Sequence, residues 1–359
     1  MTFFEFASMD EKKFFQGRGS QINPFNPYHD INYAQEHIEG LDESWPAPGE
    51  TQFFTEYPKR IVNFVDSPDS PMGISVNPYQ GCEHGCVYCY ARNTHQYWGF
   101  SAGLDFETRI ITKPDAPKLL EKAFNDKNWV PAPVSFSGNT DCYQPVERKL
   151  RLTRGLLEVC QRYRNPAGII TKNRLILRDL DILEELAQHD LIKVYISVTT
   201  LDESLRRAME PRTSTAANRL DILKKLSEKH IPVGIMIGPV IPGLNDHEIP
   251  ALLAAAAEHG ACDAGFNMVR LNGAVGQIFS NWIHKAFPDK AERVLNNIRA
   301  VHQGQLNDSR WKLRMRGDGH LAESIHKLFR LSRDKYMPER KMFTYNTSLF
   351  RRPGQMRLF

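Results

Sequence analysis

Three of the six cysteines in this 359-residue chain, Cys82, Cys86 and Cys89, lie within eight residues of one another. Thiolates are soft ligands, and a group of three suits zinc, copper or an iron–sulfur cluster. Gly81 and Gly85 each precede one of the first two cysteines, and glycine allows the backbone to curl so that the thiolates can point at one centre. The spacing therefore predicts a metal centre on a short loop.

The ligand count leaves two kinds of centre open. Structural zinc sites usually have four ligands in two spaced pairs, and the sequence has no second cysteine pair. His84 or His95 could complete a zinc site, whereas three close cysteines also suit a cubane cluster with one iron left open. We favour the cluster and interpret His84 as a loop residue, because a fourth protein ligand would occupy the open iron.

Alternating strands and helices surround this loop in the predicted secondary structure. Six runs rich in β-branched and apolar residues predict strands: 74–77, 133–137, 168–171, 193–199, 232–237 and 265–271. Between them, apolar residues at helical spacing predict four helices: 146–163, 179–189, 214–229 and 246–259, the last ending at Gly260. This alternation predicts an α/β fold with a parallel sheet and helical crossovers.

Polar side chains or glycines follow nearly every predicted strand. They are residues 139–141, 172–173, 199–200, 238–239, Arg270 and Asn272. The strand ends of a parallel barrel converge on one mouth, where active sites are assembled, whereas an open sheet would spread them along a line. The distribution of polar residues therefore favours a barrel.

Charge divides the chain into three regions. Residues 1–60, an irregular extension rich in aromatic residues and Asn-Pro turns, carry 5 Lys and Arg against 10 Asp and Glu. Residues 310–359 carry 13 against 4, and residues 61–309 form the predicted core. The basic segment could bind a phosphate backbone or neutralise the acidic extension. We favour the second interpretation. Alternating Arg and apolar residues over 310–316 also predict a half-exposed strand.

Composition excludes several classes of protein. An apolar content of 41% argues against a disordered chain, and six cysteines in 359 residues argue against a disulfide scaffold. The longest apolar run, at 233–241, is about nine residues, whereas a membrane span needs roughly 20. The first residues lack a basic start and a small-residue cleavage site. We therefore expect a cytoplasmic protein without a membrane span.

The pattern Cys82-x3-Cys86-x2-Cys89, with Tyr88 before the last cysteine, resembles the signature of the radical S-adenosylmethionine (SAM) superfamily. The resemblance implies an enzyme with a partial (β/α)6 TIM-like barrel. It implies that the cysteines bind three irons of a [4Fe-4S] cluster and that SAM chelates the fourth. An electron donor such as flavodoxin or ferredoxin would reduce the cluster. SAM would then be cleaved to methionine and a 5′-deoxyadenosyl radical, which abstracts hydrogen from a substrate.

A closer resemblance is to the spore photoproduct lyase-like branch of this superfamily, in particular to its uncharacterised bacterial members. It is carried by residues 81–92, 137–141 and 170–173, and by the Gly-Arg-Gly and Asn-Pro pairs at 17–19 and 23–24. It covers residues 17–359. The resemblance makes nucleic acid a candidate partner, to be repaired or modified, and leaves the substrate open.

The resemblance also implies a set of SAM-binding residues. Residues 138–141 replace the family's glycine-glycine-glutamate motif, which receives the methionyl amino group; the glutamate is absent, and Thr140 and Asp141 offer oxygen acceptors instead. Lys172 would pair with the methionyl carboxylate, and Tyr88 would contact the adenine side. The full set is Tyr88, Gly138, Asn139, Thr140, Asp141, Lys172, Ser197, Thr199, Glu210 and Arg212.

One departure concerns the hydrogen donor of the lyase reaction. The lyase uses a cysteine three positions before the aspartate of its motif, and here that position is Gly138. Cys142, after Asp141, is our candidate for a catalytic hydrogen-transfer residue, and the alternative is a buried inert thiol. Cys160 and Cys262 are interpreted as structural. The rival function is a binding protein whose metal or cluster merely stabilises the fold.

Overall fold

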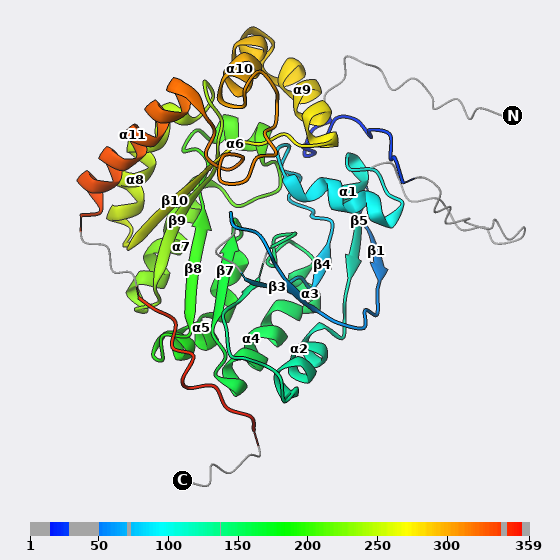
Figure 1. The fold of residues 1–359 in the computed structure, drawn as a ribbon, viewed down its shortest axis with the longest axis vertical. Coiled ribbons are helices and arrows are strands. Elements are labelled where there is room, and N and C mark those ends of the chain that lie inside the picture. Colours follow the sequence, from blue (N-terminus) through cyan, green and yellow to red (C-terminus); the bar gives the residue numbers. More distant parts are fainter. Residues whose placement is uncertain (1–14, 29–49, 70–72, 137, 339–342, 354–359) are drawn as a thin grey trace, which may run out of the picture.

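Six parallel strands form the central sheet, ordered in space as they are in the sequence (Figure 1). The computed structural model describes residues 15–28, 50–69, 73–136, 138–338 and 343–353. The strands are β3 (Ile74–Val76), β6 (Val134–Phe136), β7 (Ala167–Thr171), β8 (Ile192–Ser197), β9 (Val233–Val240) and β10 (Asp263–Met268). All six predicted strands are confirmed. β2 (Val62–Phe64) adds an antiparallel strand beside β3, and no described strand joins β2 to β10, so the barrel is partial.

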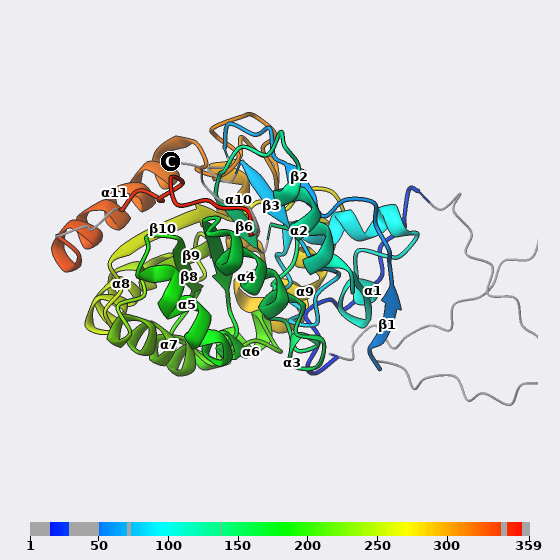
Figure 2. The same cartoon turned by 90° about the horizontal axis from the view of Figure 1, so that it is seen from below.

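Helices cover the convex side of this curved sheet (Figure 2). They are α2 (Ala116–Asn125), α4 (Leu152–Tyr163), α5 (Leu180–Ala187), α7 (Ala216–Glu228) and α8 (Ile249–Glu258), and α11 (Gly319–Tyr336) packs on α8. Gly260 has φ 84° and follows α8, as predicted. The single helix predicted over 146–163 is wrong, because Arg151 has φ 54° and separates α3 (Glu147–Leu150) from α4.

Strand β8 shows how the sheet separates core from site. Ile192, Val194 and Ile196 are fully buried in the hydrophobic core, while alternate residues belong to the other side of the sheet. On that concave side the Tyr195 hydroxyl donates a hydrogen bond to Asp263 Oδ2 (2.5 Å), and Ser197 stands at the end of the strand. The concave side therefore carries the polar groups.

A smaller sheet and two helical segments flank the cysteine loop. β4 (Tyr79–Gln80) pairs with β5 (Arg109–Thr112), which pairs with β1 (Gln52–Thr55). The 3-10 helix η1 (Tyr90–Trp98) and α1 (Leu104–Thr108) connect the loop to β5. Farther along the chain, α6 (Glu203–Met209) follows β8, and α9 (Ala274–Ala286) and α10 (Pro288–Val301) follow β10.

The strand predicted over residues 310–316 is wrong, because this segment forms turns. Met315 accepts a hydrogen bond from Met268 N (2.9 Å), which holds the segment against the edge of β10. Asp69, from the loop after β2, accepts hydrogen bonds from Lys312 N and from the Arg314 side chain. These contacts bring the two edges of the open sheet together. Among the described residues, none of the helices has the length and apolar character needed to span a bilayer.

Candidate functional site

The cysteine loop is held in a tight curl after β4. Gly81 and Gly85 have φ 78° and 70°, and a Cβ on Gly81 would lie 3.0 Å from the Arg109 carbonyl oxygen. Cys82 N donates to Phe106 O (2.8 Å), which fastens the start of the loop to α1. Cys82 and Cys86 are 7% and 8% exposed and Cys89 is half-buried, so the thiols occupy a largely dry site.

A buried ion pair supports the loop from behind. Arg92 is fully buried and donates from Nε to Cys86 O (2.9 Å) and from Nη1 to the carbonyl oxygens of Ala102 and Gly103. Its Nη2 lies 2.6 Å from Glu107 Oε1. Arg92 therefore joins the backbone of Cys86 to the segment before β5. No sequence signal marks this pair, since either residue could have lain on a helix surface.

The amino-terminal segment 15–28 packs on the same carboxylate. Gly19 N and Ser20 N donate to Glu107 Oε2 and Oε1 at 3.2 and 2.6 Å. Gly19 passes so close to the loop that a Cβ on it would lie 1.5 Å from Gly85 O. A side chain at residue 19 therefore cannot fit without moving the segment off the cysteine loop.

We predict that Gly19→Ala loosens segment 15–28 from the loop. Overpacking of this kind costs about 1–3 kcal/mol, so trypsin should cleave after Arg18 roughly fivefold faster or more, measured by mass spectrometry. Gly73→Ala is the control, because a Cβ on Gly73 would have no atom within 4 Å and the φ of this residue is not positive. Equal cleavage rates in the two variants would contradict the packing described here.

The three thiols of the cysteine loop are soft metal ligands when they are deprotonated. Burial raises the pKa of all three, that of Cys86 to about 12, so without metal they are protonated. Among the described residues, no three His, Cys, Asp or Glu side chains are arranged around a single metal ion. Zinc would need its sulfur ligands about 3.8 Å apart, whereas a cubane binds each thiolate to a different iron and needs wider spacing. Three cysteine thiols on one loop are the kind of donor set that an iron–sulfur cluster requires.

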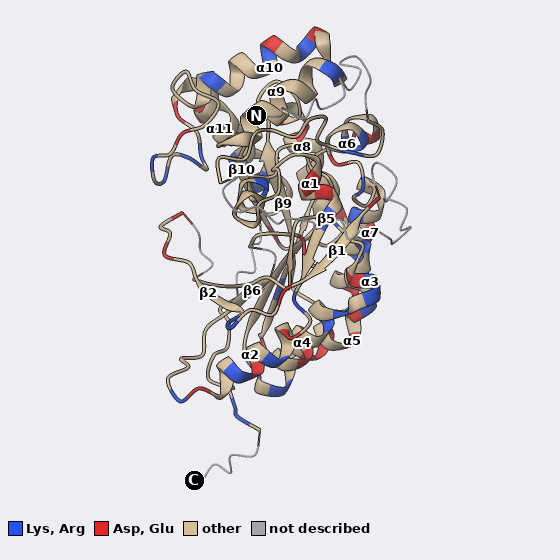
Figure 3. Ribbon diagram, turned by 90° about the vertical axis from the view of Figure 1, so that its right-hand side faces the viewer, with Lys and Arg blue, Asp and Glu red and all other residues tan. Residues whose placement is uncertain are grey.

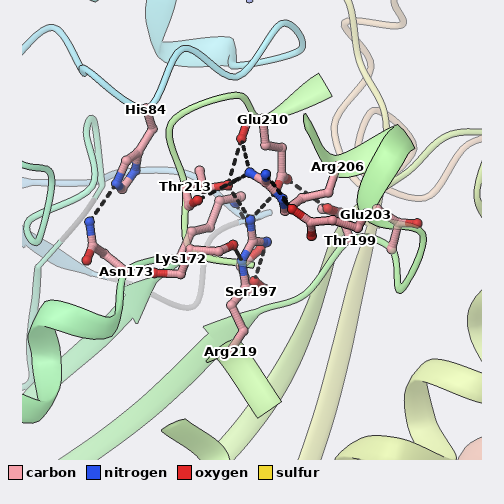
Figure 4. A network of polar contacts seen from close by, with 12 residues as sticks. His84, Lys172, Asn173, Ser197, Thr199, Glu203, Arg206, Glu210, Thr213 and Arg219 are labelled. Atoms are coloured by element: carbon pink, nitrogen blue, oxygen red, sulfur yellow. Dashed lines mark hydrogen bonds and ion pairs between the residues drawn. The ribbon is translucent and has the colours of Figure 1, made fainter. Parts of the chain in front are cut away.

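His84 and Asp141 face each other inside the protein (Figure 4 shows His84). The buried His84 ring accepts at Nε2 from Asn173 Nδ2 (3.0 Å), and its Nδ1 lies 3.5 Å from Asp141 Oδ2. Burial lowers the pKa of His84 to about 4, so the ring is neutral. Asp141 also accepts from Thr171 Oγ1 (2.7 Å) and Lys172 N (2.8 Å). Both residues thus connect the cysteine loop and the β6 end to the end of β7.

Residues 138–140 are held by hydrogen bonds to neighbouring loops, and residue 137 of the same motif lies outside the described residues. Asn139 N donates to Asn77 Oδ1 (2.8 Å), and Thr140 Oγ1 donates to Tyr79 O (3.3 Å). Gly138 O accepts from the Tyr90 hydroxyl (2.5 Å). The role of these residues and of Asp141 in binding the methionyl amino group stays a prediction.

A buried carboxylate, Glu210, gathers residues from three parts of the chain (Figure 4). It is fully buried and accepts hydrogen bonds from the Tyr88 hydroxyl, from Thr199 Oγ1 (2.8 Å) and from the Arg219 guanidinium. Tyr88 comes from the cysteine loop, Thr199 follows β8 and Arg219 lies on α7. Sequence reasoning named the first two and missed Arg219.

Lys172 completes this group. Its Nζ donates to Ser197 Oγ (2.9 Å) and lies 5.9 Å from the centroid of the Tyr88 ring. Five predicted residues therefore meet beside the cysteine loop: Tyr88, Lys172, Ser197, Thr199 and Glu210. They supply an ammonium group, hydroxyls and an aromatic ring next to the thiols.

Glu210 is ionised at neutral pH. Burial alone would raise its pKa, but Arg219, Lys172 and the hydrogen bond from Tyr88 outweigh burial and lower it to about 2. Because the folded-state pKa lies below the ordinary value of 4.5, the ionised carboxylate stabilises the fold above pH 4.5. This contribution is lost as the pH falls from 4.5 towards 2.

We predict that replacing Glu210 removes part of the acid sensitivity of the protein. The free energy of unfolding of the wild type should fall on the order of 3 kcal/mol more than that of Glu210→Gln between about pH 5 and pH 2. Urea unfolding at a series of pH values measures both. Glu228→Gln is the control, because Glu228 is 60% exposed. Parallel stability curves for wild type and Glu210→Gln would show that Glu210 is not held ionised.

Arg212 and Cys142 differ in how they are placed. Arg212 Nη2 lies 3.9 Å from Glu83 Oε1, while its Nη1 is buried without a hydrogen-bond partner among the described residues. A buried donor of this kind favours an incoming acceptor.

Cys142 is fully buried in the hydrophobic core, and its carbonyl accepts from Thr153 Oγ1 (2.6 Å). Its burial favours the inert-thiol alternative, and its catalytic role stays a prediction.

Comparison with known proteins gives the family. The profile of the Radical SAM superfamily matches residues 76–256, half of the chain, from the end of β3 to within α8. The chain belongs to the radical SAM superfamily. This superfamily consists of enzymes, so the match assigns the chain to an enzyme class and leaves its reaction open.

Two relatives of this radical SAM protein are uncharacterised proteins. One, from Mycobacterium tuberculosis, is 32% identical over 225 residues, which are 62% of this chain and 66% of the relative, just under two thirds of its length. The other, from Methanocaldococcus jannaschii, is 26% identical over 221 residues, covering 62% of this chain and 79% of the relative.

Solved structures share its fold. Spore photoproduct lyase complexed with dinucleoside spore photoproduct has a TM-score of 0.59 at 15% identity, covering 83% of this chain and 86% of the lyase. A lyase variant with bound AdoMet and the same dinucleoside has a TM-score of 0.58 at 16% identity, covering 84% and 88%. The partial barrel predicted from the sequence is confirmed.

Proposed function

We propose that this chain is a radical SAM enzyme in which Cys82, Cys86 and Cys89 hold a [4Fe-4S] cluster whose fourth iron binds SAM. The observation that supports the proposal most is that the three thiols lie on one loop whose Tyr88 hydroxyl donates a hydrogen bond to Glu210. When bound and reduced, the cluster would supply the electron that cleaves SAM into methionine and a 5′-deoxyadenosyl radical.

Several residues of the chain are suited to bind SAM. Lys172 supplies a positive charge for the methionyl carboxylate, and the buried Arg212 Nη1 offers a second donor for the same group. Tyr88 is fixed by its hydroxyl hydrogen bond to Glu210, so its ring can form a wall beside the adenine. Ser197 and Thr199 offer hydroxyls for the ribose or the carboxylate. These groups would orient SAM and exclude water from it.

We assign the protein to a reducing compartment, the cytoplasm. None of the six cysteines, all of which the structure describes, forms a disulfide, and the predicted cluster requires three of them as thiolates. A reducing compartment also provides the electron donor, of the flavodoxin or ferredoxin class, that the chemistry needs.

Nucleic acid is the substrate class that we would test first, because the lyase structures of the same fold contain a dinucleoside lesion. Deleting residues 310–359 would expose the core, since Phe329 packs against Phe266 of β10. Lys312 and Arg316 lie in the turns at residues 310–316, which we call the basic turn, and both can be replaced without deleting the helix that follows. If this turn contacts phosphates, Lys312→Glu with Arg316→Glu lowers oligonucleotide affinity and reduces the slope of log K against log salt by about 2. An unchanged affinity and an unchanged slope would show that the basic turn does not contact nucleic acid.

Anaerobic reconstitution tests the proposed function. With iron, sulfide and dithionite, the protein should form a brown cluster and convert SAM to 5′-deoxyadenosine and methionine, measured by liquid chromatography. A protein that binds iron and sulfide without cleaving SAM would support the rival, a cluster that only stabilises a binding protein.

A further inference from the structure

An exposed basic surface adjoins the outer side of the cysteine loop. It is formed by Arg148, Lys149, Leu150 and Arg151, at α3 and the turn that follows, which we call the α3 patch (Figure 3). All four residues are exposed, Leu150 to 42%. None of the three cationic side chains forms an ion pair or hydrogen bond with the described residues. Their charges are therefore available to a partner.

Two buried side chains connect the α3 patch to the loop. Gln144 accepts from Glu83 N (3.0 Å) and donates to Gly81 O (3.1 Å), and thus spans the backbone on both sides of Cys82. Glu83 Oε2 in turn accepts from Val146 N (2.8 Å), at the start of α3. The patch is therefore fixed to the residues that flank the first cysteine.

Arg212, which is also a candidate SAM-binding residue, lies beside the carboxylate of Glu83. Arg212 Nη2 is 3.9 Å from Glu83 Oε1. Glu83 is therefore shared between Val146 N and Arg212, and the three exposed cations of the α3 patch keep their positive charge.

We propose that the α3 patch is the docking surface for an acidic one-electron donor protein of the flavodoxin or ferredoxin class. The inference rests on the proposed function, because a reducible cluster must receive its electron from outside. One electron would leave the reduced donor and enter the cluster, so the donor is oxidised and the cluster reduced, with no bond formed or broken. Complementary charge speeds such encounters, and exposed Leu150 adds an apolar contact.

The position of the patch favours a donor over a nucleic acid. α3 lies with α4 and α5 outside the curved sheet (Figure 2), whereas a substrate must reach the concave side, where the radical would form. A donor has the opposite requirement, because it must approach the cluster without entering the substrate space.

The test reverses two charges that play no part in the SAM site. Arg148→Glu with Lys149→Glu is compared with Lys327→Glu with Arg330→Glu on α11, which reverses two charges far from the loop. We expect the α3 variant to bind oxidised flavodoxin at least about tenfold more weakly at low salt, by calorimetry, with the difference shrinking at high salt. 5′-Deoxyadenosine formation should fall with reduced flavodoxin and match the wild type with dithionite.

Three outcomes overturn the docking proposal. Unchanged flavodoxin affinity would show that the α3 patch does not bind the donor. A loss of oligonucleotide affinity alone would show that the patch binds nucleic acid instead. A fall with both reductants would assign the two residues to the fold or the cluster. Failure of the wild-type protein to cleave SAM with dithionite would instead refute the proposed function. The flavodoxin affinity of the two variants would still test the docking surface independently.

Discussion

Cys86→Ser is expected to lose the cluster and to reduce SAM cleavage to the level without enzyme. The wild type should bind four irons and four sulfides per chain after anaerobic reconstitution, and the variant should bind far fewer. We choose Cys86 because Arg92 holds its carbonyl oxygen and its thiol is buried. Iron and sulfide analysis, the visible spectrum and 5′-deoxyadenosine formation measure the effect.

Cys262→Ser is the matched control for this variant. Cys262 is half-buried, and its thiol donates to Val233 O (3.3 Å), a contact that a serine hydroxyl can replace. The control should keep both cluster and cleavage. A Cys86→Ser protein that retained four irons and cleaved SAM would show that the loop cysteines are not the ligands.

Arg219→Leu is expected to lower the free energy of unfolding by about 3–5 kcal/mol, because it leaves the Glu210 carboxylate buried without its cation. Arg219 is 1% exposed and also donates to Ser214 O (2.8 Å) and Ser197 O (2.9 Å). Urea unfolding followed by circular dichroism measures the loss.

Two further variants identify the cause of that loss. Lys225→Met removes an exposed pair with Asp221 and should cost about 0.3–0.5 kcal/mol. Glu210→Gln added to Arg219→Leu should restore part of the stability, since it removes the buried charge. If Arg219→Leu were as stable as Lys225→Met, Arg219 would not be neutralising a buried carboxylate.

The sequence predicted the strands and the cysteine loop because their signals are local. Runs of β-branched residues marked all six strands, and cysteine spacing marked the loop. Lys172 and Thr199 stood out as polar residues at the ends of predicted strands, and the family resemblance added Ser197 and implied the SAM-binding role of all three. These residues meet Tyr88 and Glu210 because the strands that carry them are neighbours in the sheet.

The remaining features depend on contacts between distant segments. Arg219 lies in a predicted helix, where an arginine that pairs with a buried carboxylate resembles any surface arginine. Alternating residues over 310–316 indicated a strand, but hydrogen bonds to Asp69 and to Met268 hold turns there instead. The break at Arg151 has no glycine or proline to announce it. At residues 310–316 tertiary contact overrides local propensity.

Mössbauer spectroscopy of protein reconstituted with ⁵⁷Fe tests the central claim most directly. Three irons held by Cys82, Cys86 and Cys89 and one iron open to SAM should give signals in a 3:1 ratio, and adding SAM should shift only the minor signal. Four equivalent irons, or a spectrum that SAM leaves unchanged, would contradict the account.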